Sequence, residues 1–117
     1  MLPAVGLMCV LLFLSSVDVF VQAQDGGQVV RVTAKKFEYA PSQITLKKGV
    51  PVVLEFTSLD RLHGFNCPAL GVRADIDPGK VTKVQVTPLK VGTFEFFCDN
   101  FCGSGHSNMR GKFVVTE

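Results

Sequence analysis

Apolar and polar residues alternate with a period of two in several short stretches of this chain. Val30, Val32 and Ala34 alternate with polar residues, and residues 81–87 alternate in the same way. Because the side chains of a strand point alternately to its two faces, this pattern predicts strands with one buried and one exposed face. The β-branched and aromatic run at residues 50–56 predicts a further strand.

Short segments with glycine or proline separate these stretches, as at Lys47–Gly49 and Asp77–Gly79. After residue 23, no window of about eleven residues combines a helical period with capping residues, so helix should be scarce. About six to eight short strands joined by such turns are typical of an all-β sandwich. Further strands are expected at residues 37–39, 44–46, 63–67, 93–97 and 111–116.

The amino-terminal region has a different pattern, because residues 2–17 are almost entirely apolar and carry no charge. The small residue Ala23 follows as a cleavage position that a signal peptidase accepts. We therefore expect residues 1–23 to be a signal peptide, with an uncleaved membrane anchor as the alternative. Residues 24–28 are then a flexible lead-in and residues 29–117 one exported domain, periplasmic or otherwise extracytoplasmic.

Removal of this leader changes the charge and the number of cysteines. The chain has 12 Lys and Arg against 10 Asp and Glu, and loss of Asp18 leaves nine acidic residues and a net charge of +3. This charge is too small and too scattered to favour a nucleic-acid partner. Cys9 is lost as well, so Cys67, Cys98 and Cys102 remain. An odd number of thiols in an oxidising compartment means that at least one has a role other than a disulfide.

The residues best suited to bind a metal lie together between two predicted strands. Cys98, Cys102, His106 and Met109 fall within twelve positions. Thiolate, thioether and imidazole are soft ligands that select copper or zinc, and the thioether favours copper. A further ligand is needed, and His63 is the only other histidine in the chain.

Each of these residues also has an ordinary structural interpretation. Cys98 and Cys102 alone would suit a disulfide or redox pair, Met109 a core position and His63 a structural role. Their joint spacing favours a metal site, because a simple disulfide gives no reason for the histidine and the methionine that follow. Cys67 is expected to be a buried apolar residue, with a disulfide to a loop cysteine as the alternative.

The spacing Cys-x3-Cys-x3-His-x2-Met resembles the binuclear copper A centre of cytochrome c oxidase subunit II and nitrous oxide reductase, which belong to the cupredoxin family. A second block, residues 60–65 and 68–80, is similar to the segment of subunit II that holds its first histidine. Two separated blocks in the same order make the resemblance specific. It spans about residues 29–117 and implies a cupredoxin-like Greek-key β-sandwich.

The resemblance also implies two copper ions and the residues that hold them. Cys98 and Cys102 would bridge both ions. His63 and His106 would each bind one ion, with Met109 as a weak ligand on the copper bound by His63. The backbone carbonyl of Asn100 would be the weak ligand on the other copper.

This chain departs from the oxidase pattern in three respects. Asn100 stands where the oxidases usually have Glu. A carbonyl ligand survives that change, but the acid that reaches a magnesium at the boundary with the catalytic subunit is lost. The transmembrane hairpin and the Trp-containing segment of subunit II are also missing. We therefore expect a free-standing electron carrier with a redox protein partner, such as a c-type cytochrome or a terminal oxidase or reductase.

The surroundings of the centre complete the expectations. Phe65, Phe97 and Phe101 should exclude water from it, while Asp99 should face solvent. The sequence places no base beside an open coordination position, so catalysis by this domain alone is not expected.

Two other functions remain open. A mononuclear cupredoxin would use His63, Cys102, His106 and Met109 for one copper. A periplasmic copper chaperone or thiol oxidoreductase serving oxidase assembly would also use a Cys-x3-Cys pair. Such proteins have a thioredoxin-like αβ fold, which the lack of helical periods disfavours, but a cupredoxin that transfers copper stays possible.

Overall fold

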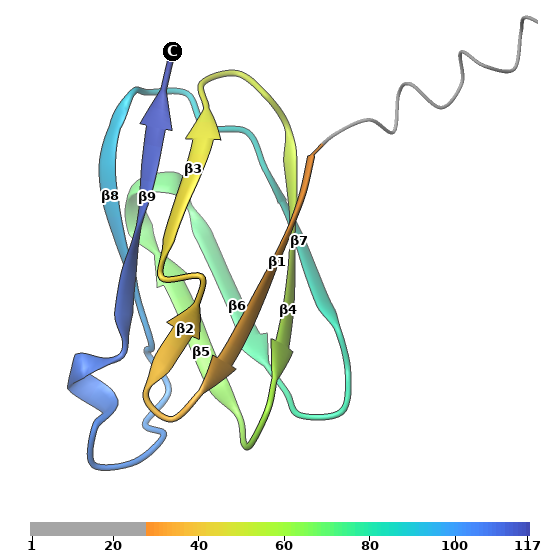
Figure 1. Ribbon diagram of the computed structural model, residues 1–117, viewed down its shortest axis with the longest axis vertical. Coiled ribbons are helices and arrows are strands. Elements are labelled where there is room, and N and C mark those ends of the chain that lie inside the picture. The colour runs from red at the N-terminus through yellow and green to blue at the C-terminus, as the bar shows by residue number, and fades with distance from the viewer. Residues whose placement is uncertain (1–27) are drawn as a thin grey trace, which may run out of the picture.

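The computed structural model of the chain describes residues 28–117 (Figure 1). The predicted signal peptide or anchor at 1–23 and residues 24–27 of the predicted lead-in lie outside the described residues. The described part contains nine strands. They are β1 (Gln28–Lys35), β2 (Glu38–Ala40), β3 (Gln43–Lys47), β4 (Val52–Ser58), β5 (His63–Cys67), β6 (Val72–Ile76), β7 (Thr82–Val86), β8 (Gly92–Phe97) and β9 (Arg110–Thr116).

The strands form two sheets that pack face to face (Figure 1). One sheet has the order β2-β1-β4-β7 and the other the order β3-β9-β8-β5-β6. β1 is parallel to β4 and β3 is parallel to β9, whereas the other neighbours are antiparallel. The chain therefore crosses between the sheets, and the predicted all-β Greek-key sandwich is confirmed.

The alternation in the sequence explains which face of each strand is buried. In β6, Val72, Ala74 and Ile76 are buried while Arg73 and Asp75 are exposed. Helix is scarce, as expected. Within residues 28–117 it is limited to two 3₁₀ turns, η1 (Pro68–Leu70) and η2 (His106–Asn108). No helix in this part of the chain is both long enough and apolar enough to span a bilayer.

Aromatic side chains fill the core between the sheets. The ring of Tyr39 meets Phe65 and Phe96 edge-on, with centroids 5.4 and 5.3 Å apart. Phe56 and Phe113 pack against the same cluster. Edge-on contacts suit the charge distribution of aromatic rings, and truncation of such a buried ring typically costs about 3–5 kcal/mol of stability.

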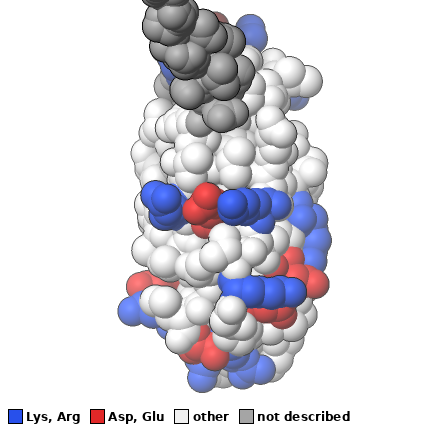
Figure 2. All heavy atoms as spheres, turned by 90° about the vertical axis from the view of Figure 1, so that its right-hand side faces the viewer, with Lys and Arg blue, Asp and Glu red and all other residues white. Residues whose placement is uncertain are grey.

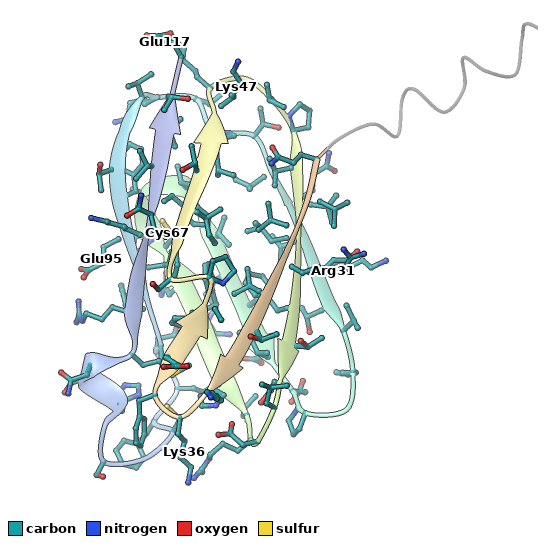
Figure 3. The ribbon with its side chains drawn as sticks, viewed as in Figure 1. Arg31, Lys36, Lys47, Cys67, Glu95 and Glu117 are labelled. Carbon is teal, nitrogen blue, oxygen red and sulfur yellow. The ribbon has the colours of Figure 1, made fainter. Side chains whose placement is uncertain are left out.

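The connections at the lower end of the sandwich in Figure 1 include the β1–β2 loop, the β4–β5 loop and the long β8–β9 connection. The backbone N–H of Lys36 donates to Asp60 Oδ2 at 2.8 Å, and that of Leu59 donates to the Ala34 carbonyl at 2.9 Å. Lys36 lies at this end, and Lys47 and Glu117 lie at the opposite one (Figure 3). We call the end with Lys36 the loop end.

A row of charges crosses the exposed face of the four-stranded sheet, with uncharged surface above it and further charged residues below it (Figure 2). Glu55 of β4 pairs with Arg31 of β1 at 3.4 Å and with Lys83 of β7 at 3.9 Å. Exposed pairs of this kind contribute about 0–1 kcal/mol. The row lies on a sheet away from the loop end, so it provides a control for charge substitutions near that end.

Candidate metal centre

The six residues predicted as metal ligands come together at the loop end. Three are placed by strands, since His63 begins β5, Cys98 follows β8, and Met109 precedes β9. The Cys98 N–H donates to the Met109 carbonyl at 3.1 Å, which closes the base of the β8–β9 connection. The other three are carried by that connection, namely Asn100, Cys102 and His106.

Two thiols form the middle of the site. The sulfurs of Cys98 and Cys102 lie 3.5 Å apart, and both residues are buried and free of disulfides. A ring nitrogen of His63 and these two sulfurs all lie within 4.8 Å of one another. An imidazole and two thiols at this separation are a donor set for a soft metal ion.

The remaining candidates border one sulfur or the other. Nδ1 of His106 and Sδ of Met109 each lie 3.7 Å from the Cys102 sulfur. The Cys98 thiol donates to the backbone carbonyl of Asn100 at 3.0 Å. The weak donors predicted for the site therefore lie beside different thiols, Met109 beside Cys102 and the Asn100 carbonyl beside Cys98.

His63 is held in a definite orientation. Its Nε2 lies 2.7 Å from Asp60 Oδ1. A carboxylate only accepts hydrogen bonds, so Nε2 is the donor, and in the neutral ring Nδ1 then keeps its lone pair. Within residues 28–117, Nδ1 is the one buried side-chain nitrogen or oxygen without a hydrogen-bond partner. A buried lone pair without a partner is costly, and a metal ion would satisfy it, so the donor set fits copper.

Asp60 was not among the residues predicted for the site, although it lies three positions before His63. Burial alone would raise the pKa of its carboxyl group. Hydrogen bonds from the Lys36 backbone, the His63 ring and the Arg61 backbone outweigh that effect and lower the pKa to about 2. Asp60 is therefore ionised at neutral pH and can orient the imidazole.

The Cys102 thiol is protonated at neutral pH when no metal is bound. Burial, followed by the neighbouring Cys98 thiol, raises the pKa of Cys102 to about 11. A metal ion must displace such a proton, so metal uptake releases protons. Burial also raises the pKa of Cys67, which is fully buried in β5 as an apolar residue. Cys67 forms no disulfide, in agreement with the preferred expectation.

The aromatic surroundings differ in part from expectation. Phe65 is fully buried and Phe97 half-buried, but Phe101 is 74% exposed. Its ring extends outward and contacts the ring of His106, with centroids 5.6 Å apart. The ring of Phe37 instead covers the loop, since a Cβ placed on the glycine at 103 would lie only 2.9 Å from it. Phe37 was not predicted for this role.

Asp99 is an exposed residue, as expected, but its carboxylate is not free in solvent. Its side chain is 22% exposed and is paired with Arg73. The hydrogen bonds from Arg73 lower the pKa of the Asp99 carboxyl group, helped by a hydrogen bond from Asn66, while burial acts in the opposite direction. The loop between Cys98 and Asn100 is thereby tied to β5 and β6.

Comparisons with known proteins agree with this architecture. The chain is 35% identical over 97 residues to cytochrome c oxidase subunit 2 of Thermus thermophilus, covering 83% of this chain and 72% of that protein. It is 32% identical over 90 residues to the nitrous-oxide reductase of Ralstonia nicotianae. That match covers 74% of this chain and only 14% of the reductase.

A solved structure with a related fold is the metal-binding domain of a Cu(I)-exporting P-type ATPase of Streptococcus pneumoniae, determined with Cu(I). The two share 26% sequence identity and a TM-score of 0.63, over 80% of this chain and 89% of that one. A family model described as a cupredoxin-like domain matches residues 4–115. With its two-sheet sandwich and its donors at the loop end, the chain belongs to the cupredoxin-like family, together with cytochrome c oxidase subunit 2.

Proposed function

We propose that this chain is an extracytoplasmic electron-transfer protein that holds two copper ions in a centre of the copper A type. The observation that carries the proposal is the pair of free buried thiols, 3.5 Å apart, with two histidines and two weak donors around them. A mononuclear centre needs one thiolate. Two thiols shared between two sets of terminal donors are suited to a pair of ions.

Each donor has a role in this proposal. Cys98 and Cys102 would bridge both ions, and His63 would bind one of them through the free Nδ1. Met109 would be the weak ligand on that ion. His106 and the Asn100 carbonyl would be the terminal ligands of the second copper ion. The relatives support copper as the metal, since cytochrome c oxidase subunit 2 and nitrous-oxide reductase are among them.

When bound, the copper pair supplies a one-electron couple whose charge is shared by both metals and both sulfurs. The protein would hold the metal donors in fixed positions and exclude water from them. Asp60 fixes the orientation of the His63 ring. The backbone hydrogen bond from the Cys98 N–H to the Met109 carbonyl closes the base of the β8–β9 connection. Phe37, which packs against the loop at Gly103 and Gly105, would help to keep water from the donors. Donors that move little during electron transfer favour fast transfer.

The location and the partner belong to the same proposal. Residues 1–23 would direct export, and contact with a membrane would arise only if they are retained as an anchor. A redox protein, such as a c-type cytochrome or a terminal oxidase or reductase, would exchange electrons with the loop end. The exposed ring of Phe101 beside His106 offers an apolar contact there.

Copper content and electron paramagnetic resonance test the proposal. The protein should hold two copper ions per chain and give a hyperfine pattern from one unpaired electron shared by two equivalent nuclei. One ion per chain, with a pattern from a single nucleus, would contradict it and select the mononuclear cupredoxin.

A second candidate is a cupredoxin that transfers copper rather than electrons. The similarity to the metal-binding domain of a Cu(I)-exporting ATPase favours it. The two candidates differ in copper exchange. An electron carrier should keep its copper when mixed with a metal-free acceptor domain, whereas a copper-transfer protein should release Cu(I) to it within minutes.

A further inference from the structure

The segment from Cys98 to Asn100 carries a thiol and a carbonyl of the candidate centre, yet it lies outside the strands. β8 ends at Phe97. The backbone bond from Cys98 to Met109 fixes the start of this segment. The position of the Asn100 carbonyl depends on side-chain contacts made by the two residues after Cys98.

Arg73 on β6 makes the main contact. Its Nε donates to Asp99 Oδ2 at 2.8 Å, and its Nη2 donates to Asp99 Oδ1 at 2.5 Å. This two-point arrangement matches the planar guanidinium to the planar carboxylate, so it fixes direction as well as distance. Nη1 of the same side chain donates to Asp75 Oδ1 at 2.5 Å, which holds the guanidinium in place.

Two asparagine amides extend the network. Nδ2 of Asn66 donates to Asp99 Oδ2 at 3.0 Å, and Nδ2 of Asn100 donates to Asp75 Oδ1 at 3.4 Å. The side chain of Asn100 is turned toward Asp75, and the backbone carbonyl of Asn100 accepts a hydrogen bond from the Cys98 thiol. A glutamate at this position would place a second carboxylate beside Asp75, so this network suits an amide.

The carboxylate of Asp99 also lies directly over Gly64, the residue after His63. A Cβ on Gly64 would overlap Asp99 Oδ1. The Gly64 N–H points to the Cys98 sulfur at 3.5 Å. The ion pair between Arg73 and Asp99 therefore holds the segment from Cys98 to Asn100 next to β5, the strand that carries His63.

We propose that Arg73 is a positioning residue for the metal centre, acting through Asp99 to fix the Cys98 sulfur and the Asn100 carbonyl relative to His63. This inference rests on the proposed copper function. Arg73 is 43% exposed, and an ion pair this open contributes little to the stability of the whole fold. Its effect should therefore appear in the geometry of the centre and in copper retention more than in unfolding.

The test compares Arg73→Gln with Arg31→Gln in the copper-loaded protein. Arg31→Gln removes an exposed arginine–carboxylate pair away from the loop end, a single contact of 3.4 Å with Glu55. Arg73→Gln should make the two copper nuclei inequivalent in electron paramagnetic resonance, and it should speed copper loss to a Cu(I) chelator about three- to tenfold. Arg31→Gln should leave both measurements unchanged. Arg73→Lys, which keeps the charge but loses the two-point contact, should fall between wild type and Arg73→Gln.

A double-mutant cycle identifies the route through Asp99. Asp99→Asn should reproduce most of the Arg73→Gln effect, and the double variant should be little worse than either single one. Additive effects would overturn the route through Asp99. Thermal unfolding of each variant distinguishes positioning from general destabilisation, so an Arg73→Gln protein that loses copper only as it unfolds would also overturn the inference.

The wild-type protein separates this inference from the proposed function. If wild type holds no copper pair, the proposed function fails and the positioning role fails with it. If wild type holds the pair and Arg73→Gln matches it in spectrum and copper loss, the positioning role alone is wrong.

Discussion

The carboxylate of Asp60 holds the ring of His63 by a hydrogen bond of 2.7 Å to Nε2, and this leaves Nδ1 buried and without a partner. Asp60 is itself held by the backbone N–H groups of Lys36 and Arg61, at 2.8 and 2.7 Å. The β1–β2 loop and the β4–β5 loop thus orient one imidazole together. An aspartate fixed in this way also makes the free nitrogen more basic and so a better metal ligand.

Asp60→Ala should therefore weaken copper binding. Loss of a carboxylate that orients a ligating histidine typically lowers metal affinity about 10- to 100-fold. Asp60→Asn keeps the shape of the side chain and one acceptor oxygen, so copper affinity should fall less in this variant than in Asp60→Ala. Competition with a Cu(I) chelator of known affinity measures both. Equal affinities for wild type and Asp60→Ala would mean that His63 is not a ligand.

The three thiols should respond differently to substitution. Cys98→Ser should abolish the spectrum of a copper pair and leave at most one copper per chain, because a bridging sulfur is lost. Cys67→Ala should leave copper content and spectrum unchanged, since Cys67 lies outside the donor cluster. Removal of its buried sulfur should cost roughly 1 kcal/mol in urea unfolding. A changed spectrum in Cys67→Ala would mean that the ligand set is wrong.

The strands were predictable because alternation reports directly on burial. In β3, Ile44 and Leu46 are buried between exposed neighbours, as the sequence pattern indicates. The grouping of Cys98, Cys102, His106 and Met109 could be expected from side-chain chemistry and spacing within one short segment. His63 was added as the only other histidine in the chain, and the Asn100 carbonyl came from the family resemblance. Alternation and ligand spacing are local signals, and each needs only a short segment of sequence.

The contacts that hold the donors were not predictable, because they depend on which loops meet at one end. Arg73 alternates with buried Val72 and Ala74, so the pattern marks it as an ordinary exposed residue. Phe101 was expected to exclude water from the centre. Cys102 is fully buried, but the ring of Phe101 extends into solvent. Phe37 covers the β8–β9 connection instead, and no local sequence pattern indicates that Phe37 lies close to this connection.

Met109→Leu should change the centre without removing it. Met109 is fully buried, and a swap that preserves volume usually costs less than about 1.5 kcal/mol of stability. Leu cannot act as the weak thioether donor, however. The oxidised centre carries more charge than the reduced one, so loss of that donor destabilises the oxidised form more. Copper content should stay the same while the reduction potential rises, as measured by a redox titration followed by absorbance. An unchanged potential would contradict a ligand role for Met109, and Leu46→Met in the same core is the control for altered packing.

Tyr39 should make the stability of the protein depend on alkaline pH. Burial raises the pKa of this phenol above its ordinary value of 10.0, and the nearby thiols of Cys98 and Cys102 act in the same direction. The folded protein therefore keeps the proton while the unfolded chain loses it above about pH 10. This contribution is fully present below pH 10 and falls as pH rises further, by about 1.4 kcal/mol per pH unit.

Urea unfolding of wild type and Tyr39→Phe at neutral pH and above pH 10 measures this contribution. At neutral pH the variant should be less stable by about 1 kcal/mol, because the hydroxyl donates to the Gly64 carbonyl at 2.6 Å. Above pH 10 the difference should shrink and then reverse, because unfolded wild type gains from ionising the phenol and the variant cannot. The chain has one Tyr, so no other phenol titrates in this range. Cys67, whose pKa is also raised, is present in both proteins and cancels in the difference. A difference that stays constant with pH would mean that the phenol is not buried beside the centre.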